Sequence, residues 1–551
     1  MSGTIRTIMQ VSPSARQIPL SLFLRFAAAL TTALFLTGCM LPPRQGLASP
    51  QSQSQSPSLT PAEAASTAIG KAVAAQSAAH PPGTSGIHPL ADGTDAFAAR
   101  MLLAAAAERT LDVQSYIWRN DTTGRLVLQA LREAADRGVR VRLLLDDNGI
   151  AGLDPILAAL DAHPKIEVRL FNPFPVRWFK PLGFVTDFSR ANRRMHNKSF
   201  SADAQATIIG GRNIGDEYFD ALVEGLVFAD LDVLAFGPAA QDISADFDRY
   251  WDSASAYPVA MVIKPTASDA SKVADALAPL DRIRADVAAD PEKRRYLRSV
   301  KGSDFATDLQ AGRLDLEWAR VQTLSDDPAK GLGPVARSDL MASELGRVLR
   351  KPRRDVELVS AYFVPGEEGT AAFAALAKEG VRVRILTNAL EATDVAAVHS
   401  GYARRREPLL AAGVELFEMR RHSATPDDGA EGGSGPGAFG SSASTLHPKT
   451  FSVDRARVFI GSFNFDPRSA NLNTELGFVI DSPALASGIE DAFTQRIPEQ
   501  SYQVKLDAQG RLYWLEPTPN GLVRHDTEPG ASWFKRTGVR LMSLLPIEWL
   551  L

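Results

Sequence analysis

The chain has 551 residues, of which 45% are hydrophobic and 23% are charged, and its formal net charge is −4. This length is enough for two or three domains with full cores, and the slightly acidic balance argues against a surface built for bulk nucleic-acid binding. The single cysteine excludes an internal disulfide framework.

The first 39 residues predict a bacterial export signal. Three arginines precede the apolar run 26–36, which is too short to span a membrane comfortably. The run leads into Leu-Thr-Gly-Cys, which resembles a lipoprotein lipobox and implies that Cys39 is diacylated and becomes the mature N-terminus. We therefore expect a periplasm-facing lipoprotein of the cell envelope, stably anchored by two or three acyl chains. Met40 follows the cysteine, which by resemblance to Gram-negative sorting rules favours the outer membrane.

A flexible tether and a first α/β lobe are predicted next. Residues 40–83 are rich in Pro, Ser, Gln and Ala, which is typical of a tether, with a modest helix over 61–79. Residues 84–255 alternate between helix and strand patterns. Helices are expected over 95–108 and 126–137, and strands over 111–118, 139–147 and 166–171. This alternation predicts a parallel or mixed sheet flanked by helices.

Residues 172–194 interleave aromatic and basic side chains. Such a segment suits contact with lipid head groups, stacking on single-stranded bases, or a loop folded over its own core. The sequence leaves these three interpretations open.

The order of elements repeats in the second half of the chain. Residues 256–335 are helical and highly charged, and predict a linker or bridging subdomain. Over 336–499, strand patterns at 356–365, 379–388 and 414–419 match the three strands of the first half. The repetition predicts two lobes of the same architecture.

Three features of the second half keep more than one interpretation. Residues 424–445 are rich in Gly and Ser and predict a mobile loop, with or without the role of a lid. His399 and Tyr402 lie either on a solvated helix face or in a pocket for an acceptor lipid. Residues 500–551 form a C-terminal extension whose aromatic, leucine and basic side chains suit either membrane contact or packing on the lobes.

Two stretches share the template His-x-Lys-x4-Asp-x6-Gly-x2-Asn. They comprise His196, Lys198, Asp203, Gly210 and Asn213, and His447, Lys449, Asp454, Gly461 and Asn464. The chain has only eight histidines, so two copies at identical spacing are not chance. On a strand, residues i and i+2 project from the same face, so each His and Lys point together before a turn at Asp. An imidazole, a cation and an amide around a glycine suit an anionic, oxygen-rich group such as phosphate.

This double motif resembles the phospholipase D superfamily, which is defined by two His-x-Lys-x4-Asp motifs, and the resemblance covers about residues 86–493. It implies an α/β fold of two tandem phospholipase D-type lobes, each a mixed β-sheet flanked by helices. A pseudo-twofold axis would relate the lobes and place one active site at their interface.

The chemistry of a phosphodiester predicts distinct roles for the two histidines. His196 is expected to attack phosphorus and form a phosphohistidine, and His447 to act as general acid and then base. The other predicted site residues are Lys198, Lys449, Asn213, Asn464 and Ser462, which would hold the non-bridging oxygens, and Asp203 and Asp454, which complete the motif and are expected to secure each hairpin. The mechanism needs no metal or other cofactor, and no metal-ligand cluster with sensible spacing occurs in the sequence.

The resemblance also implies that a carboxylate downstream of each motif orients the catalytic histidine. It assigns this role to Asp230 and Glu475, with Asp232 as a rival in the first half. A carboxylate on one ring nitrogen determines the tautomer and stabilises the imidazolium.

The substrate is predicted from further resemblance. Segments 115–147, 210–219 and 399–410 look like those of bacterial cardiolipin synthases of the C-type branch. This implies phosphatidyl transfer between phosphatidylglycerol and a second phospholipid, including phosphatidylethanolamine. The alternatives are a hydrolytic phospholipase D that uses water as acceptor and, disfavoured by the acidic charge and the anchor, a nuclease of the superfamily. We expect phospholipids and the membrane as partners, and no nucleic acid.

Overall fold

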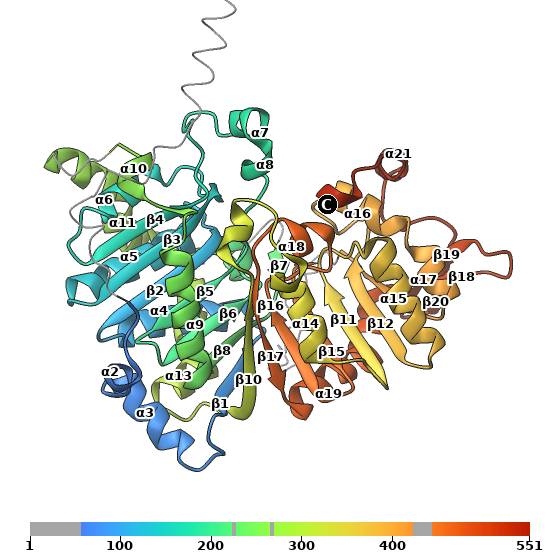
Figure 1. Ribbon diagram of the computed structural model, residues 1–551, viewed down its shortest axis with the longest axis horizontal. Coiled ribbons are helices and arrows are strands. Elements are labelled where there is room, and N and C mark those ends of the chain that lie inside the picture. The colour runs from blue at the N-terminus through green and yellow to red at the C-terminus, as the bar shows by residue number, and fades with distance from the viewer. Residues whose placement is uncertain (1–56, 223–226, 265–268, 422–443) are drawn as a thin grey trace, which may run out of the picture.

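The computed structural model describes residues 57–222, 227–264, 269–421 and 444–551 (Figure 1). The predicted export signal with Cys39, and residues 424–443 of the predicted mobile loop, lie outside the described residues. Among the helices that are described, none has the length and apolar character needed to cross a membrane.

The first half alternates strands and helices. Its strands are β1 (Ser85–Leu90), β2 (Thr110–Ile117), β3 (Arg140–Gly149), β4 (Ile166–Phe171), β5 (Ser199–Ala202), β6 (Ala206–Gly210), β7 (Val227–Ala229), β8 (Asp232–Phe236) and β9 (Ala256–Pro258). Its helices are α2 (Pro61–Ala65), α3 (Ala68–Ser77), α4 (Gly93–Ala106), α5 (Thr122–Asp136), α6 (Asp154–Leu160), α7 (Leu182–Thr186), α8 (Phe188–Ala191), the single turn η1 (Asp216–Tyr218), α9 (Pro238–Trp251) and α10 (Val259–Val262).

A helical segment leads into the second half. It contains α11 (Ala270–Ala289), α12 (Pro291–Gly302) and α13 (Asp304–Gln310). The strands that follow are β10 (Glu317–Ser325), β11 (Asp355–Ser360), β12 (Arg382–Asn388), β13 (Glu415–Met419), β14 (Ser444–Leu446), β15 (Lys449–Val453), β16 (Arg457–Gly461), β17 (Leu476–Asp481), β18 (Ser501–Leu506), β19 (Leu512–Thr518) and β20 (Gly521–His525). The helices are η2 (Pro328–Gly331), η3 (Arg337–Asp339), α14 (Met341–Leu349), α15 (Gly366–Lys378), α16 (Ala396–Ala403), α17 (Arg406–Ala411), α18 (Pro467–Asn471), α19 (Pro483–Asp491), the π-helical η4 (Ala492–Arg496), α20 (Ile497–Gln500), α21 (Trp533–Met542) and η5 (Glu548–Leu550).

Eighteen strands form one continuous sheet across both lobes. The pairings give the order β9-β4-β3-β2-β5-β6-β8-β1-β10-β17-β16-β15-β11-β12-β13-β18-β19-β20. Parallel pairs occur at equivalent places, β2-β3-β4 in one lobe and β11-β12-β13 in the other, and the neighbouring strands are antiparallel. Reading outward from the central β1–β10 pair gives the same order on both sides, which is the predicted pseudo-twofold arrangement of mixed sheets (Figure 1).

Strand β10 lies within residues 256–335, the segment expected to be a helical linker. It is the counterpart of β1, pairing with β1 on one edge and with β17 on the other. Its buried Ala319 and Leu324 are separated by four exposed or half-buried residues, three of them polar, so the charged composition of the segment concealed the strand. The bridge between the lobes is therefore a shared sheet edge as well as a group of helices.

Residues 57–83, expected to belong to a flexible tether, fold against the first lobe. Helix α2 begins with a capping box between Thr60 and Glu63, and the Thr67 side chain caps the start of α3. The Ser58 amide donates to Asp248 on α9 over 2.9 Å, which ties the segment to the lobe.

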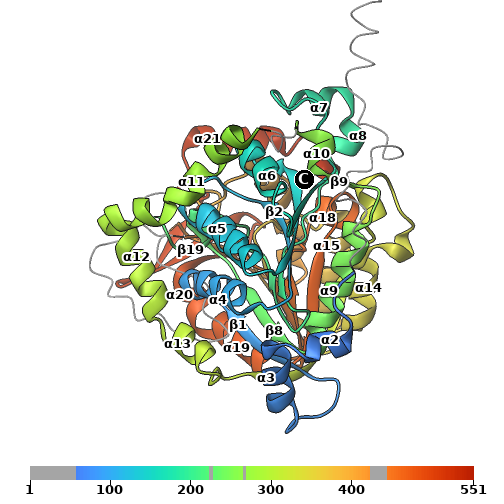
Figure 2. The same cartoon turned by 90° about the vertical axis from the view of Figure 1, so that its left-hand side faces the viewer.

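The first-lobe sheet has apolar packing on both faces. Leu143 and Leu145 of β3 face the core formed with α4 and α5, whereas Leu144 between them packs with Phe247 and Trp251 of α9. Figure 2 shows α4 and α5 on one side of the sheet and α9 on the other. This alternation holds the ends of β2 to β6, where the first motif lies, in a rigid frame.

Candidate active site

Each motif opens a β-hairpin whose turn is held by the motif aspartate. In the first hairpin, Asp203 and Ala204 have φ of 52° and 51°, and Asp203 accepts hydrogen bonds from the backbone N–H groups of residues 108–110 over 2.8–2.9 Å. In the second, Asp454 accepts from the N–H groups of residues 353–355 over 2.7–3.3 Å. Each aspartate follows its histidine by seven positions. In extended chain this is roughly 20 Å, so both aspartates lie at the end of the hairpin away from the imidazoles.

The entry to each hairpin pairs with the opposite lobe. Met195 forms a parallel bridge with Thr474, and the His196 N–H donates to the Thr474 carbonyl over 2.9 Å. In the symmetric contact, β14 pairs with β7, and the His447 N–H donates to the Ala229 carbonyl over 2.7 Å. The residue after each of these partners is a carboxylate, so the backbone pairing delivers a carboxylate from one lobe to the histidine of the other.

The two predicted orienting residues therefore act across the interface. Glu475 Oε2 lies 2.9 Å from His196 Nδ1, and Asp230 Oδ2 is hydrogen bonded to His447 Nδ1. The sequence did not indicate that each carboxylate contacts the histidine of the opposite half, because strand pairing between the lobes is not visible in it. The rival Asp232 is bound instead to Arg100, over 2.8 Å.

The tautomer of His196 follows from its neighbours. Its Nδ1 also lies 3.1 Å from the Ser462 carbonyl oxygen, and a carbonyl only accepts hydrogen bonds. Nδ1 therefore carries the proton, and Nε2 has its lone pair free. Burial, followed by the charges of Lys198 and Lys449, holds the pKa of His196 well below its usual range, so the neutral form is favoured.

His447 has a more strongly anionic partner. Burial alone would raise the pKa of Asp230, but His447 and Lys449 lower it below its ordinary value, so this carboxylate is ionised. Burial also lowers the pKa of the His447 imidazole, with a further contribution from Lys449, and Asp230 opposes the shift. The Tyr218 ring packs edge-on against the imidazole, with 5.6 Å between the ring centres. The Phe228 ring is tilted against it, with 5.1 Å between the ring centres.

Glu475 differs from Asp230 in its charge. Burial raises the pKa of Glu475 to about 7, against the opposing effects of Lys198 and Ser462. The Ser462 hydroxyl donates to Glu475 and accepts from the Leu476 N–H over 3.0 Å. Ser462, expected to bind substrate, thus holds the carboxylate that orients His196.

Both motif lysines are buried beside the histidines. Lys198 donates to the His196 carbonyl over 2.6 Å, and burial lowers its pKa to about 7. Lys449 Nζ lies 2.9 Å from His447 Nδ1 and 3.2 Å from Nε2. Because both lysines and His447 depress the pKa of His196, the two motifs converge on one electropositive site. An anionic oxygen in this site would raise the pKa of both lysines and favour their charged form.

The two motif asparagines are both buried. Asn213 Oδ1 accepts from the Ile117 N–H over 3.2 Å, which positions its amide. Asn464 is 4% exposed, and its Oδ1 has no hydrogen-bond partner among the described residues. An amide without a complete set of partners is available to a polar ligand.

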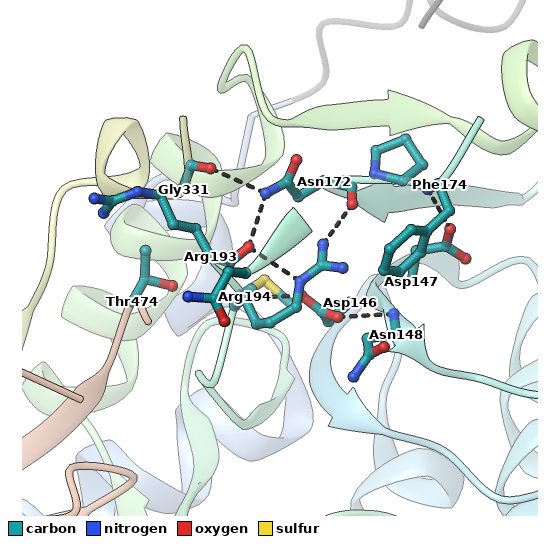
Figure 3. A network of polar contacts seen from close by, with 12 residues as sticks. Asp146, Asp147, Asn148, Asn172, Phe174, Arg193, Arg194, Gly331 and Thr474 are labelled. Carbon is teal, nitrogen blue, oxygen red and sulfur yellow. Dashed lines mark hydrogen bonds and ion pairs between the residues drawn. The ribbon is translucent and has the colours of Figure 1, made fainter. Parts of the chain in front are cut away.

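A polar network behind the first motif sets the position of His196 (Figure 3). Buried Asp146 accepts from the Met195 N–H over 2.8 Å and from the Asn148 N–H over 2.9 Å, and it pairs with Arg194 at 3.2 Å. The side-chain amide of Asn172 donates to the carbonyls of Arg193 and Gly331 over 2.7 and 2.9 Å. The network was not predicted, because its members come from four separate segments.

A buried ion pair in the segment between the lobes holds the backbone of Glu475, the carboxylate that contacts His196. Lys330 and Asp326 are 2.8 Å apart, and Asp326 accepts from the Glu475 N–H over 3.0 Å. Lys330 also donates to the Ser469 carbonyl over 2.9 Å. The pair lies in the charged segment that was expected to be a linker, and nothing in its local pattern distinguishes it from surface charge.

Two other candidate residues lie away from the motifs. His399 is buried, with Nε2 2.9 Å from Glu528 and 2.7 Å from the Arg406 guanidinium. Tyr402 is buried and donates to Glu418 over 3.0 Å. Neither residue lies on a solvated face; both belong to a structural cluster of ion pairs in the second lobe.

Comparison with known proteins agrees with this geometry. A family model described as "Cardiolipin synthase, PLD-like domain" matches residues 102–251 and 345–497. The chain is 49% identical over 474 residues to cardiolipin synthase C of Escherichia coli (strain K12), covering 85% of this chain and 97% of the relative. It is 24% identical to cardiolipin synthase B of the same strain, covering 80% and 87%. The crystal structure of phosphatidylserine synthase from Haemophilus influenzae Rd KW20 shares the fold, at 15% identity and a TM-score of 0.50 over 76% of this chain and 87% of that one.

The two lobes and their paired His-Lys hairpins define an enzyme of the phospholipase D superfamily. The match to both lobes and the identity along nearly the whole of a relative show the family within it. The chain belongs to the cardiolipin synthase family of phospholipase D-like phosphatidyltransferases.

Proposed function

We propose that this enzyme makes cardiolipin by moving a phosphatidyl group from one phospholipid to the glycerol head group of phosphatidylglycerol. The observation that carries the proposal is the crosswise pairing of His196 with Glu475 and of His447 with Asp230, which holds two imidazoles at one electropositive site. The family relationship supports the choice of lipid substrates.

In the first step, His196 Nε2 attacks the phosphorus of the donor lipid. The bond from phosphorus to the head-group oxygen breaks, and His447 gives its proton to that oxygen, so glycerol or ethanolamine leaves with a neutral hydroxyl group. The neutral, Nδ1-protonated His196 suits the nucleophile, and ionised Asp230 suits the residue that must hold a proton.

In the second step, His447 removes the proton from a hydroxyl of the acceptor phosphatidylglycerol. The resulting oxygen attacks phosphorus, the bond to His196 Nε2 breaks, and the first histidine is restored. In this mechanism Lys198, Lys449, Asn213 and Asn464 hold the non-bridging oxygens through both steps.

Hydrolysis is the competing outcome, because water at the acceptor position would release phosphatidic acid from the same intermediate. The test is incubation of the purified protein with labelled phosphatidylglycerol, with and without phosphatidylethanolamine. Labelled cardiolipin is expected as the main product. Phosphatidic acid as the only product would identify a hydrolase, and cleavage of single-stranded DNA that is lost in His196→Ala would identify a nuclease.

The assignment of the two histidines has its own test. His447→Ala should accumulate labelled phosphoenzyme from phosphatidylethanolamine labelled in its diacylglycerol moiety, because breakdown of the intermediate loses its base. His196→Ala should form none. Label retained by His196→Ala and absent from His447→Ala would reverse the roles.

We also propose that the chain is a lipoprotein anchored through Cys39, in the outer membrane of the envelope. The support is the sequence alone: a short apolar run that ends at the only cysteine of the chain. Labelled palmitate should be incorporated in the wild type and not in Cys39→Ser. Fractionation of the envelope would then show which membrane holds the protein.

A further inference from the structure

Large apolar side chains are exposed on two protrusions, one from each lobe. The first-lobe arm, residues 178–188, includes α7 and exposes Trp178, Phe179, Val185 and Phe188. The C-terminal arm, residues 533–549, includes α21 and exposes Trp533, Phe534, Leu541, Leu544, Leu545 and Trp549. Trp178 is 86% exposed, Phe534 is 80% and Leu544 is 76%, so these side chains project into solvent.

Both arms lie on the same side of the molecule. Figures 1 and 2, which differ by a quarter turn, both place α7, α8 and α21 at the top of the protein. Arg468 on α18 joins the bases of the arms, since it donates to the Asn192 side-chain oxygen over 2.7 Å and to the Leu550 carbonyl over 3.1 Å. Arg468 follows Asn464 of the second motif by four residues, so the arms meet beside the active site.

The base of the first-lobe arm is rigid. Buried Asp147 accepts from the Phe174 N–H over 2.7 Å, binds the Arg177 guanidinium, and pairs with Lys180 at 3.0 Å (Figure 3 shows Asp147 and Phe174). The adjoining Asn172 network ties this base to the segment that carries His196. The exposed aromatic residues therefore sit on a structure held in one orientation relative to the nucleophile.

The C-terminal arm is also seated on its lobe. Ser532 caps α21, with its hydroxyl accepting from the Lys535 N–H over 3.2 Å, and Val539 on the inner side of the helix is buried. The Lys535 ammonium donates to the Thr393 carbonyl over 3.4 Å. With the inner side packed, the outer side presents the leucines and aromatic rings to solvent.

We propose that the two arms together insert into the surface of a phospholipid bilayer and set the active site against it. The inference rests on the proposed function for the identity of the substrate, but its evidence is separate. Tryptophan, phenylalanine and leucine at the tips, with charged groups at the bases, match the composition that favours the interface of a bilayer.

The charges distinguish a bilayer from single-stranded nucleic acid. Binding to a phosphate backbone needs free cations along the aromatic surface. In and beside the first-lobe arm, Arg177, Lys180 and Arg190 are each already paired with an aspartate. Docking through the first-lobe arm is therefore driven by apolar side chains, and its contribution is expected to depend little on salt.

The test uses the full chain with Cys39→Ser as the reference, so that no acyl anchor contributes. Binding is measured by flotation with vesicles of equal parts phosphatidylglycerol and phosphatidylethanolamine, at low and high salt. Adding Trp178→Ser and Phe534→Ser to the reference should weaken binding by about tenfold or more, because two exposed aromatic groups no longer leave water. Raising the salt should change binding of the reference by less than about twofold.

A matched pair of leucines provides the control. Leu544→Ser alters the C-terminal arm and should weaken vesicle binding, whereas Leu522→Ser alters a 69% exposed leucine on β20, outside both arms, and should not. Equal effects of the two substitutions, unchanged binding of the aromatic double variant, or binding that disappears at high salt would overturn the proposal. Since all of these side chains are exposed, thermal unfolding should not change.

Activity measurements separate this proposal from the proposed function. The aromatic double variant should lose activity on vesicles by about the same factor as binding, and keep full activity on short-chain phosphatidylglycerol dissolved as monomers. Equal loss on both substrates would show that the arms shape the active site and would overturn docking. A reference protein that binds vesicles through the arms but transfers no phosphatidyl group would uphold docking and reject the proposed function.

Discussion

The two histidine centres share one template and differ in the carboxylate that each receives from the opposite lobe. His447 is paired with Asp230, whose pKa lies below its ordinary value because of His447 and Lys449 despite burial. His196 is paired with Glu475, whose pKa burial raises to about 7. Duplication thus gave a symmetric frame, and the side chains within it made one centre suited to hold a proton and the other suited to attack.

The difference extends to the residue that packs on each carboxylate. A Cβ on Gly211 would lie 2.1 Å from the nearest oxygen of Asp230, so only glycine leaves room for the shorter carboxylate. The equivalent residue of the second lobe is Ser462, whose hydroxyl donates to the longer Glu475. Each lobe thus fits a carboxylate beside the histidine of the other lobe, with aspartate next to glycine in one case and glutamate next to serine in the other. The two carboxylates differ in charge.

Replacing Asp230 and Glu475 in turn by their amides should give the largest difference in kcat between the two centres. Asp230→Asn should lower kcat for phosphatidyl transfer by about 1000-fold, because an ionised partner that stabilises the imidazolium is replaced by a neutral amide. Glu475→Gln should lower kcat by about tenfold, since a pKa of about 7 leaves Glu475 largely neutral below neutral pH. The rate of cardiolipin formation at saturating lipid measures both.

Circular dichroism and thermal unfolding should show that both variants are folded. Equal losses would mean that the two centres are chemically equivalent. A larger loss in Glu475→Gln would reverse the assignment and make His196 the acid and base.

Substitutions of Gly211 and Ser462 test whether the residue that packs on each carboxylate controls the position of that carboxylate. Gly211→Ser should lower kcat by about 100-fold, because the new side chain displaces Asp230 from His447. Ser462→Gly removes one hydrogen bond from Glu475 without a clash and should cost about tenfold or less. Gly211→Ser with near wild-type activity would show that the position of Asp230 is not critical.

The charge of Glu475 also predicts how stability depends on pH. Its folded pKa of about 7 lies above the ordinary value of 4.5, so the folded state keeps a proton that the unfolded state releases between these values. This contribution to stability is complete below about pH 4.5 and is lost as the pH rises through about 7. Between about pH 5 and pH 8, Tm of the wild type should fall by about 2 °C more than Tm of Glu475→Gln. Parallel curves in a calorimeter would show that Glu475 titrates normally.

Much of the frame was predictable, because it depends on local patterns. The buried strands β3 and β12 are rich in Val, Leu and Ile, and both motifs are defined by spacing along the chain. Residues such as Asp230 and Glu475 were identified by resemblance, but their crosswise pairing was not, since Asp230 and His447 are 217 positions apart. Strand β10 was missed because its apolar residues are few and its partners, β1 and β17, are distant in sequence.

The same limit applies to the supporting residues of the site. Asp146, Asn172 and Lys330 gain their meaning only from contacts between segments, and each looks locally like a strand end, a loop or a surface charge. The turn aspartates are the exception. Their place after the strand predicted a structural role, and each hydrogen bonds to the start of a neighbouring strand.

These aspartates give the smallest expected effect on catalysis. Asp203→Asn and Asp454→Asn keep a residue that tolerates the positive φ of the turn but lose part of the charged acceptor. We expect the free energy of unfolding to fall by about 2 kcal/mol for buried Asp203 and about 1 kcal/mol for half-buried Asp454, measured with urea. Per folded molecule, kcat should stay within about twofold, because both groups lie at the far end of their hairpins. A tenfold loss of kcat with unchanged stability would show that the turn reaches the reacting phosphate, and the separation of frame from chemistry in each lobe would fail.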